Sequence, residues 1–185
     1  MKLPIVKYGN PILRAPGKRV GPVDERIRTL AADMLETMHA ANGIGLAAQQ
    51  VGAALQLTVL DVSQVEDRPS TMKLNGTDVD PTSAMPLVLL NPKLELHEET
   101  TSGNEGCLSF PDINADIDRA ISVRVEAETL EGETVQIEAA GLLARALQHE
   151  LDHLNGILFI DRMSSVAKAS LSSRLKRLQK ETMGR

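Results

Sequence analysis

The amino-acid sequence predicts an α+β fold, in which antiparallel strands pack around a central helix and a further helix follows at the C-terminus. Apolar and polar residues alternate over residues 121–127 and again over 135–139, with turn-forming residues between them, which is typical of a β-hairpin. Residues 141–155, directly afterwards, are rich in Leu and Ala and carry apolar residues at helical spacing. Because the composition does not change sharply along the chain, we expect a single domain over residues 1–185.

The N-terminal part of the chain is expected to contain an extended lead-in, a helix and a strand. Residues 3–22 hold four of the nine prolines, which disfavour a helix. Asp24 is a suitable N-cap, apolar residues at helical spacing follow it, and an Asn-Gly pair is a stop signal, which together predict a helix over 24–41. Alternating and β-branched residues then predict a strand over 55–62.

A second strand, a loop and a final helix complete the expected structure. Residues 86–96 alternate as a strand does, whereas residues 64–85 are rich in polar and turn-forming types and are expected to form a long surface loop. Three leucines at helical spacing predict a helix over 164–181. Residues 165–185 carry six positive charges and one negative charge, so we expect a basic C-terminal helix over residues 164–185.

The composition excludes several classes of protein. The single cysteine rules out an intramolecular disulfide and fits a reducing compartment, and no stretch approaches the roughly 18 apolar residues of a membrane span. Only three aromatic residues occur and the net charge is −5, which argues against base stacking with single-stranded nucleic acid. We therefore expect a cytoplasmic protein that binds neither DNA nor membranes.

The clearest chemical signal is a His-Glu-x-x-His pattern inside the helix predicted after the hairpin. His149 and His153 project from one face of that helix, where both can bind one metal ion. Glu150 lies close to the same face and can reach a water molecule at the ion without being a ligand. The other two histidines, His39 and His97, have no such partners and are expected to be surface or packing residues.

Two histidines do not complete a catalytic metal site, which usually takes three protein ligands. Cys107 lies between two β-rich stretches, after Gly106, and is the candidate third ligand. A lone cysteine is more often a small buried apolar residue, and a further interpretation makes it a nucleophile with a histidine base. We favour the ligand, because a nucleophile gives the second histidine of the pattern no use.

The segment over residues 43–50, Gly-Ile-Gly-Leu-Ala-Ala-Gln-Gln, is also unusual. Its two glycines could form a phosphate-binding turn, but a dinucleotide fingerprint also needs a preceding strand and a third glycine, which are both absent. Taken alone, the segment is typical of a helix C-cap followed by a packing turn of small residues.

Residues 43–50, 105–109 and 148–153, in this order and at these separations, closely resemble the three signature motifs of the peptide deformylases. The resemblance runs from Ile5 to about Met163, and the C-terminal helix is similar to that of the bacterial form. It implies an enzyme that removes the formyl group from the N-terminal formyl-methionine of newly made polypeptides and releases formate.

The chain departs from the family pattern in small ways. Residues 64–85 look longer than in compact members, and Asn114 stands where some members have an arginine. Arg119 and Asp152 match positions that look structural in the family.

The resemblance implies that Cys107, His149 and His153 hold one divalent metal ion. Ferrous iron is expected, with zinc, nickel or cobalt as possible substitutes. The ion would polarise the formyl oxygen, while Glu150 would act as a general base and then as a general acid.

The resemblance also implies which groups contact the substrate. The side-chain amide of Gln50 and the backbone N–H of Leu108 are expected to stabilise the negative charge that develops on the formyl oxygen. The segment over 43–45 would bind an extended peptide like an added strand, and an apolar pocket would hold the methionine. The residues expected to bind substrate are Gly43, Ile44, Gly45, Gly106, Leu142 and Ala146. Whether Arg145 points into this pocket is left open.

The sequence leaves other interpretations of these residues open. A metalloprotease could use the same helix, but would usually take a third His or Glu as a ligand. A structural metal site or a metal sensor would need a fourth protein ligand. The basic helix is either a solvated amphipathic helix or a surface that binds ribosomal RNA near the nascent chain.

Overall fold

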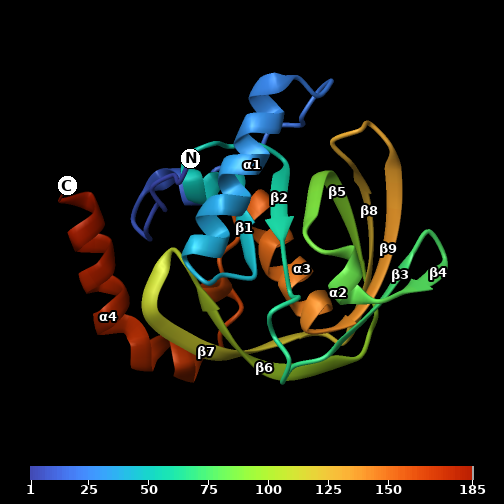
Figure 1. Ribbon diagram of the computed structural model, residues 1–185. Coiled ribbons are helices and arrows are strands. Elements are labelled where there is room, and N and C mark those ends of the chain that lie inside the picture. The colour runs from blue at the N-terminus through green and yellow to red at the C-terminus, as the bar shows by residue number, and fades with distance from the viewer. Residues whose placement is uncertain (185) are drawn as a thin grey trace.

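The computed structural model describes residues 1–184 and confirms the α+β class (Figure 1). One sheet has seven strands in the order β1-β2-β5-β8-β9-β3-β4, a second sheet consists of β6 and β7, and neighbouring strands in both sheets are antiparallel. The strands are β1 Gly45–Ala47, β2 Leu57–Leu60, β3 Ser70–Leu74, β4 Thr77–Val79, β5 Leu87–Leu96, β6 Thr100–Cys107, β7 Phe110–Ala120, β8 Ser122–Glu128 and β9 Thr134–Gly141. The helices are α1 Glu25–Ala40, α2 Pro81–Ala84, α3 Leu142–Leu154 and α4 Ser165–Met183, with short 3-10 turns η1 Pro11–Arg14, η2 Ala48–Val51 and η3 Phe159–Asp161.

The three long helices and the hairpin form where the sequence predicts them. The side chain of Asp24 accepts a hydrogen bond of 3.1 Å from the N–H of Ile27 and so caps α1. Ser164 caps α4 in the same way, through the N–H of Ala167 at 3.1 Å. In the β8–β9 hairpin Val125 lies opposite Ile137, and both are fully buried, as the alternation predicts.

The prediction of a long loop over residues 64–85 is wrong. This segment contains β3, β4 and α2, and it extends the large sheet beyond β9. Asn75 and Gly76, at φ angles of 50° and 84°, make the turn between β3 and β4, which is a hairpin signal that the prediction missed. Met72 is the only buried residue of β3 and β4, and both strands are short and rich in polar residues, so they give little apolar signal.

Two segments that carry the site form strands that the residue pattern alone does not predict. Gly45–Ala47, which taken alone is typical of a packing turn, is the strand β1 at the edge of the seven-stranded sheet. Residues 100–120 form the long β6–β7 hairpin, for which no strands were predicted. Glu105 is the only buried residue in β6, and the polar and glycine-rich sequence of this strand therefore gives no apolar pattern.

The helix α3 lies in the middle of the molecule, and each of its residues is buried (Figure 1). Its apolar side packs on the large sheet, while its other side faces the β6–β7 hairpin. The C-terminal helix α4 packs beside β7 through Leu171, Leu175 and Leu178, which join a cluster around Phe110 and Phe159. Within residues 1–184, no helix is both long enough and apolar enough to cross a membrane.

Candidate metal centre and active site

Two elements bring the three predicted metal ligands together. His149 and His153 lie one turn apart on α3, and Cys107 ends β6 at the tip of the hairpin. One potential ligand atom from each residue lies within 4.8 Å of the other two, and the Sγ of Cys107 is 3.4 Å from the Nε2 of His153. The tip of the hairpin reaches α3 because Cys107 pairs with Phe110 across a two-residue turn. This spacing fits one metal ion bound by three residues.

The surroundings of the two histidines suit a cation. The Nδ1 of His149 lies 2.9 Å from the Oε1 of Glu105, a contact that orients the ring and leaves Nε2 for a metal. Burial lowers the pKa of His149, but its hydrogen bonds to Cys107 and Glu105 outweigh burial and raise this pKa well above the usual value. Burial, together with the charges of His149 and Arg119, keeps the pKa of His153 well below its usual value. The site thus favours positive charge at His149, while the imidazole of His153 stays neutral and can act as a metal ligand.

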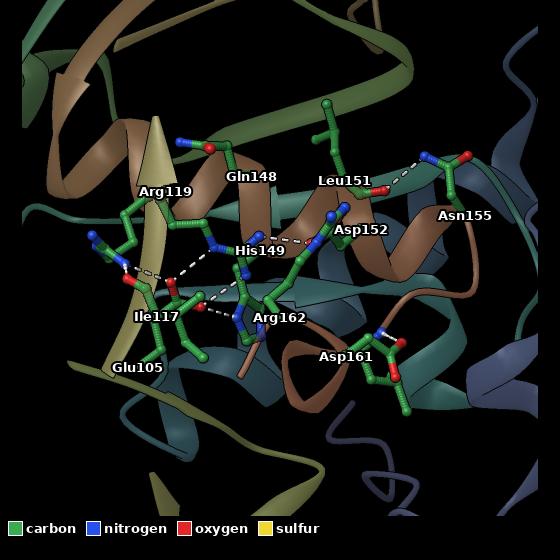
Figure 2. Close-up of polar contacts among 12 residues, drawn as sticks. Glu105, Ile117, Arg119, Gln148, His149, Leu151, Asp152, Asn155, Asp161 and Arg162 are labelled. Atoms are coloured by element: carbon green, nitrogen blue, oxygen red, sulfur yellow. Dashed lines mark hydrogen bonds and ion pairs between the residues drawn. The ribbon is translucent and has the colours of Figure 1, made fainter. Parts of the chain in front are cut away.

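A network of charged residues, buried except for Arg162, lies behind the histidines (Figure 2). The guanidinium of Arg119 donates two hydrogen bonds of 2.9 Å to Glu105 and one of 2.7 Å to Asp152, and Arg162 also binds Asp152. Burial opposes the ionisation of Glu105, yet the hydrogen bonds from His149 and Arg119 lower its pKa to about 2. The network therefore holds Glu105 ionised in the position that orients His149.

Arg145, whose direction was left open by the sequence, points inward to this network. Its guanidinium donates to Glu105 at 2.8 Å, to the backbone oxygen of Ile117 at 2.7 Å and to that of Thr101 at 2.9 Å. These bonds tie α3 to both strands of the hairpin that carries Cys107. The roles of Glu105 and Arg145 were missed, because residues bonded to each other from distant parts of the chain leave no local pattern.

Glu150 lies next to the candidate ligands and is almost fully buried. Burial raises the pKa of its carboxyl to about 7. Among residues 1–184, its Oε2 has no hydrogen-bond partner. A Cβ atom at Gly45 would lie only 2.5 Å from the Oε1 of Glu150, so a glycine is needed in β1 to make room for this carboxylate.

Gln50 and Leu108 both lie beside the candidate metal ligands, but Gln50 follows β1 of the large sheet and Leu108 follows β6 of the small one. The amide of Gln50 is buried, its Oε1 accepts from the N–H of Ala47 at 2.9 Å, and its Nε2 donates to the Oγ of Ser109 at 3.1 Å. The same Nε2 lies 3.5 Å from the Sγ of Cys107. Leu108 occupies the turn directly after Cys107, so its backbone N–H lies beside the candidate metal ligands.

A cavity of about 570 Å³ opens onto these groups. All the predicted catalytic, metal and substrate-binding residues except His153 line it, and His153 is buried. The lining also includes residues that the sequence does not single out, among them Lys7, Arg68, Asp112 and Ile113. Of the two remaining histidines, His39 contacts Asp61 at 2.9 Å and His97 is exposed, and neither lines this cavity.

Fold and site together define a class of protein: an α+β metal-dependent hydrolase with a candidate Cys-His-His metal site and a buried glutamate beside it. The family model of the polypeptide deformylases matches residues 2–169, and the chain belongs to this family. Members of the family depend on a metal ion to remove the N-formyl group from newly made polypeptides, and this chain is an enzyme of that kind.

Individual relatives are similar to this chain in sequence or structure over almost its whole length. A peptide deformylase of Methylacidiphilum infernorum is 43% identical over 180 residues, which are 97% of this chain and 94% of the relative. The crystal structure of a plant peptide deformylase has a TM-score of 0.84 at 38% identity and covers 97% of this chain and 90% of its own. The structure of the Thermotoga maritima peptide deformylase has a TM-score of 0.75 at 36% identity, with 89% and 99% covered.

Proposed function

We propose that Cys107, His149 and His153 hold the metal ion of this deformylase, within one catalytic domain formed by the whole chain, residues 1–185. The observation that carries the proposal is the convergence of their ligand atoms within 4.8 Å, with the Nδ1 of His149 already engaged by Glu105. A bound divalent ion would polarise the formyl carbonyl and make a water molecule more acidic. One thiolate and two imidazoles suit ferrous iron, and also zinc, nickel or cobalt.

In this proposal Glu150 moves the proton. Its pKa of about 7 lets the carboxylate take a proton from the attacking water near neutral pH and return it to the departing nitrogen. The unpartnered Oε2 supports this role, because one carboxylate oxygen has no competing hydrogen bond from residues 1–184.

Gln50 and Leu108 are proposed to bind the developing oxyanion. Ser109 accepts one hydrogen of the Gln50 amide, which fixes the side chain. The second hydrogen points toward the Sγ of Cys107, from which a substrate oxygen would take it. The N–H of Leu108 would supply the other donor. Loss of one such donor typically costs about 3 kcal/mol of transition-state stabilisation.

The edge strand β1 is proposed to pair with the substrate backbone. The N–H of Asp61 in the segment after β2 donates to the oxygen of Ile44 at 2.8 Å. In an antiparallel ladder the next residue points its polar groups the other way, so the N–H and C=O of Gly45 face the open edge. An extended formyl peptide can add there as a further strand, with Gly43 and Gly106 allowing close approach and its methionine side chain against Leu142 and Ala146.

The C-terminal helix is proposed to bind ribosomal RNA, in the cytoplasm where the formylated chains emerge. Its three leucines pack on the domain, whereas its five described basic residues are exposed. These basic residues are Lys168, Arg174, Lys176, Arg177 and Lys180. The sixth basic residue of this segment, Arg185, lies outside the residues that the structure describes. Neutralising the last four of the five should weaken ribosome binding at moderate salt and leave formate release from short peptides unchanged, whereas unaltered binding would leave α4 a structural role.

The central test is an assay on protein purified without oxygen. We expect one bound divalent ion per chain and formate release from a formyl-Met peptide, with no reaction of the acetyl-Met counterpart. Activity that falls in air would support ferrous iron as the ion, because the iron or the thiolate oxidises. Cleavage of internal peptide bonds without formate release would contradict the proposal and favour a metalloprotease.

A further inference from the structure

The N-terminal segment over residues 6–8 crosses from one sheet to the other directly beside the two oxyanion donors. The N–H of Val6 donates to the backbone oxygen of Gln50 at 2.7 Å, and the N–H of Tyr8 donates to that of Ser109 at 2.9 Å. Between them, the Nζ of Lys7 donates to the backbone oxygen of Leu108 at 3.0 Å. Three consecutive residues thus bind the backbone on both sides of the candidate oxyanion site.

The two donors need such a connection because they belong to different parts of the fold. Gln50 lies in η2, which follows β1 of the seven-stranded sheet, whereas Leu108 lies in the turn of the separate β6–β7 hairpin. The Tyr8 ring stacks on Phe110 with 4.8 Å between ring centroids, which anchors the segment beside this turn. A shift between sheet and hairpin would change the distance between the two donors, and the segment over residues 6–8 opposes that shift.

We propose that Lys7 is a positioning residue for the oxyanion site. Its ammonium group makes a charge-assisted hydrogen bond to the Leu108 carbonyl, a type of bond roughly twice as strong as a neutral one. Fixing the C=O of Leu108 restricts the backbone dihedrals of this residue in the turn, and its N–H is then held toward the substrate. Lys7 is partly buried, lines the cavity and acts on the reaction through Leu108.

The matched variants are Lys7→Met, Lys7→Arg and, as a control, Lys18→Met, which removes an exposed lysine elsewhere in the lead-in. Removing a donor altogether costs about 100-fold or more in kcat, so misplacing one is expected to cost about tenfold. We expect Lys7→Met to lower kcat about tenfold for a formyl-Met peptide while KM and metal content stay unchanged. Lys7→Arg, which keeps a charged donor, should recover most of the rate, and the control should match the parent.

Any other outcome overturns the inference. An unchanged kcat in Lys7→Met shows that the bond does not position the donor, and a raised KM with the parent kcat shows that Lys7 binds substrate instead. Equal losses in Lys7→Met and Lys7→Arg, with a lower Tm, assign the residue to folding alone. If Lys7→Met does not fold, Lys7→Gln, which is polar but uncharged, takes its place. The same fall in kcat is expected of it, and the same outcomes would contradict the inference.

The inference rests on the proposed oxyanion site, and the parent enzyme separates the two failures. A parent protein that releases no formate contradicts the proposed function, whereas an active parent with an equally active Lys7→Met contradicts the role of Lys7 only.

Discussion

Replacing Glu105 by Gln should weaken both the folded state and the metal site. In the native chain this carboxylate accepts two hydrogen bonds from Arg119, one from Arg145 and one from His149, all between 2.8 and 2.9 Å. Glutamine has nearly the same size, but it is neutral and turns an NH₂ group toward the guanidinium groups. The variant therefore leaves Arg119 and Arg145 buried without their shared counter-charge.

The size of the effect follows from this burial. Breaking a buried ion pair from one side costs about 3–5 kcal/mol, and here both arginines are less than one tenth exposed. His149 also exchanges a carboxylate acceptor for the weaker, neutral amide oxygen of glutamine, and disturbing such a partner typically weakens metal affinity by about 10–100-fold. We expect a loss of about 3 kcal/mol in the free energy of unfolding of the metal-free protein, and a fall in metal affinity within that range.

Urea unfolding of chelator-treated protein measures the first quantity, and competition with a metal chelator measures the second. Glu131→Gln, at an exposed position in the β8–β9 turn, is the matched control and should behave like the parent. A loss below about 1 kcal/mol, the usual value of an exposed pair, would refute the reasoning that Glu105 compensates two buried arginines. Unchanged metal affinity would show that His149 is oriented without it.

Three further substitutions test other parts of the molecule. Cys107→Ser should bind metal more weakly and lose formate release, and a variant that keeps both would show that this cysteine is an ordinary packing residue. Glu150→Gln should retain the metal but lower kcat at least about 100-fold, as expected for a general base, and loss of the metal instead would make Glu150 a ligand. In the Asp161→Asn variant the ion pair with Arg14 is lost. Burial opposes ionisation of Asp161, but hydrogen bonds from Arg14 and the N–H of Leu158 outweigh it and lower its pKa. The native chain should therefore be more stable than Asp161→Asn, by less than about 1 kcal/mol, above the ordinary pKa of 3.8. This difference should shrink as the pH falls below 3.8 and be lost as it falls through the lowered pKa of the folded chain. Urea titrations at pH 7 and pH 3 measure it, and a difference as large at pH 3 as at pH 7 would contradict the assigned cause.

The parts of the molecule that the sequence predicts well are those with a local period. The helix spacing of His149 and His153 and the alternation of the β8–β9 hairpin each repeat within one element, and both elements form as expected. Cys107 could be chosen as the third ligand because the two histidines of the helix need one more, and a nucleophilic cysteine would leave the second histidine without a use.

The parts that were missed depend on residues far apart in the chain. Lys7 contacts Leu108, and Arg145 contacts Glu105 and the backbone of the β6–β7 hairpin, so neither shows a pattern within its own segment. The strand β3 was missed for a different reason, because it pairs with β9 at the margin of the sheet and buries a single apolar side chain, Met72. Its backbone pairs with β9 and β4, and composition does not record such pairing.

Cys107 lies on the β6–β7 hairpin and both histidines lie on α3, so an ion bound by the three, as proposed, would cross-link two separate parts of the fold. Because an unfolded chain does not bring these ligands together, binding energy adds directly to the folded state. An ion present at about a thousand times its Kd would raise the stability by about 4 kcal/mol. Depletion of the metal should therefore shorten the lifetime of the folded chain as well as stop its chemistry, and it should loosen the β6–β7 hairpin from α3 first.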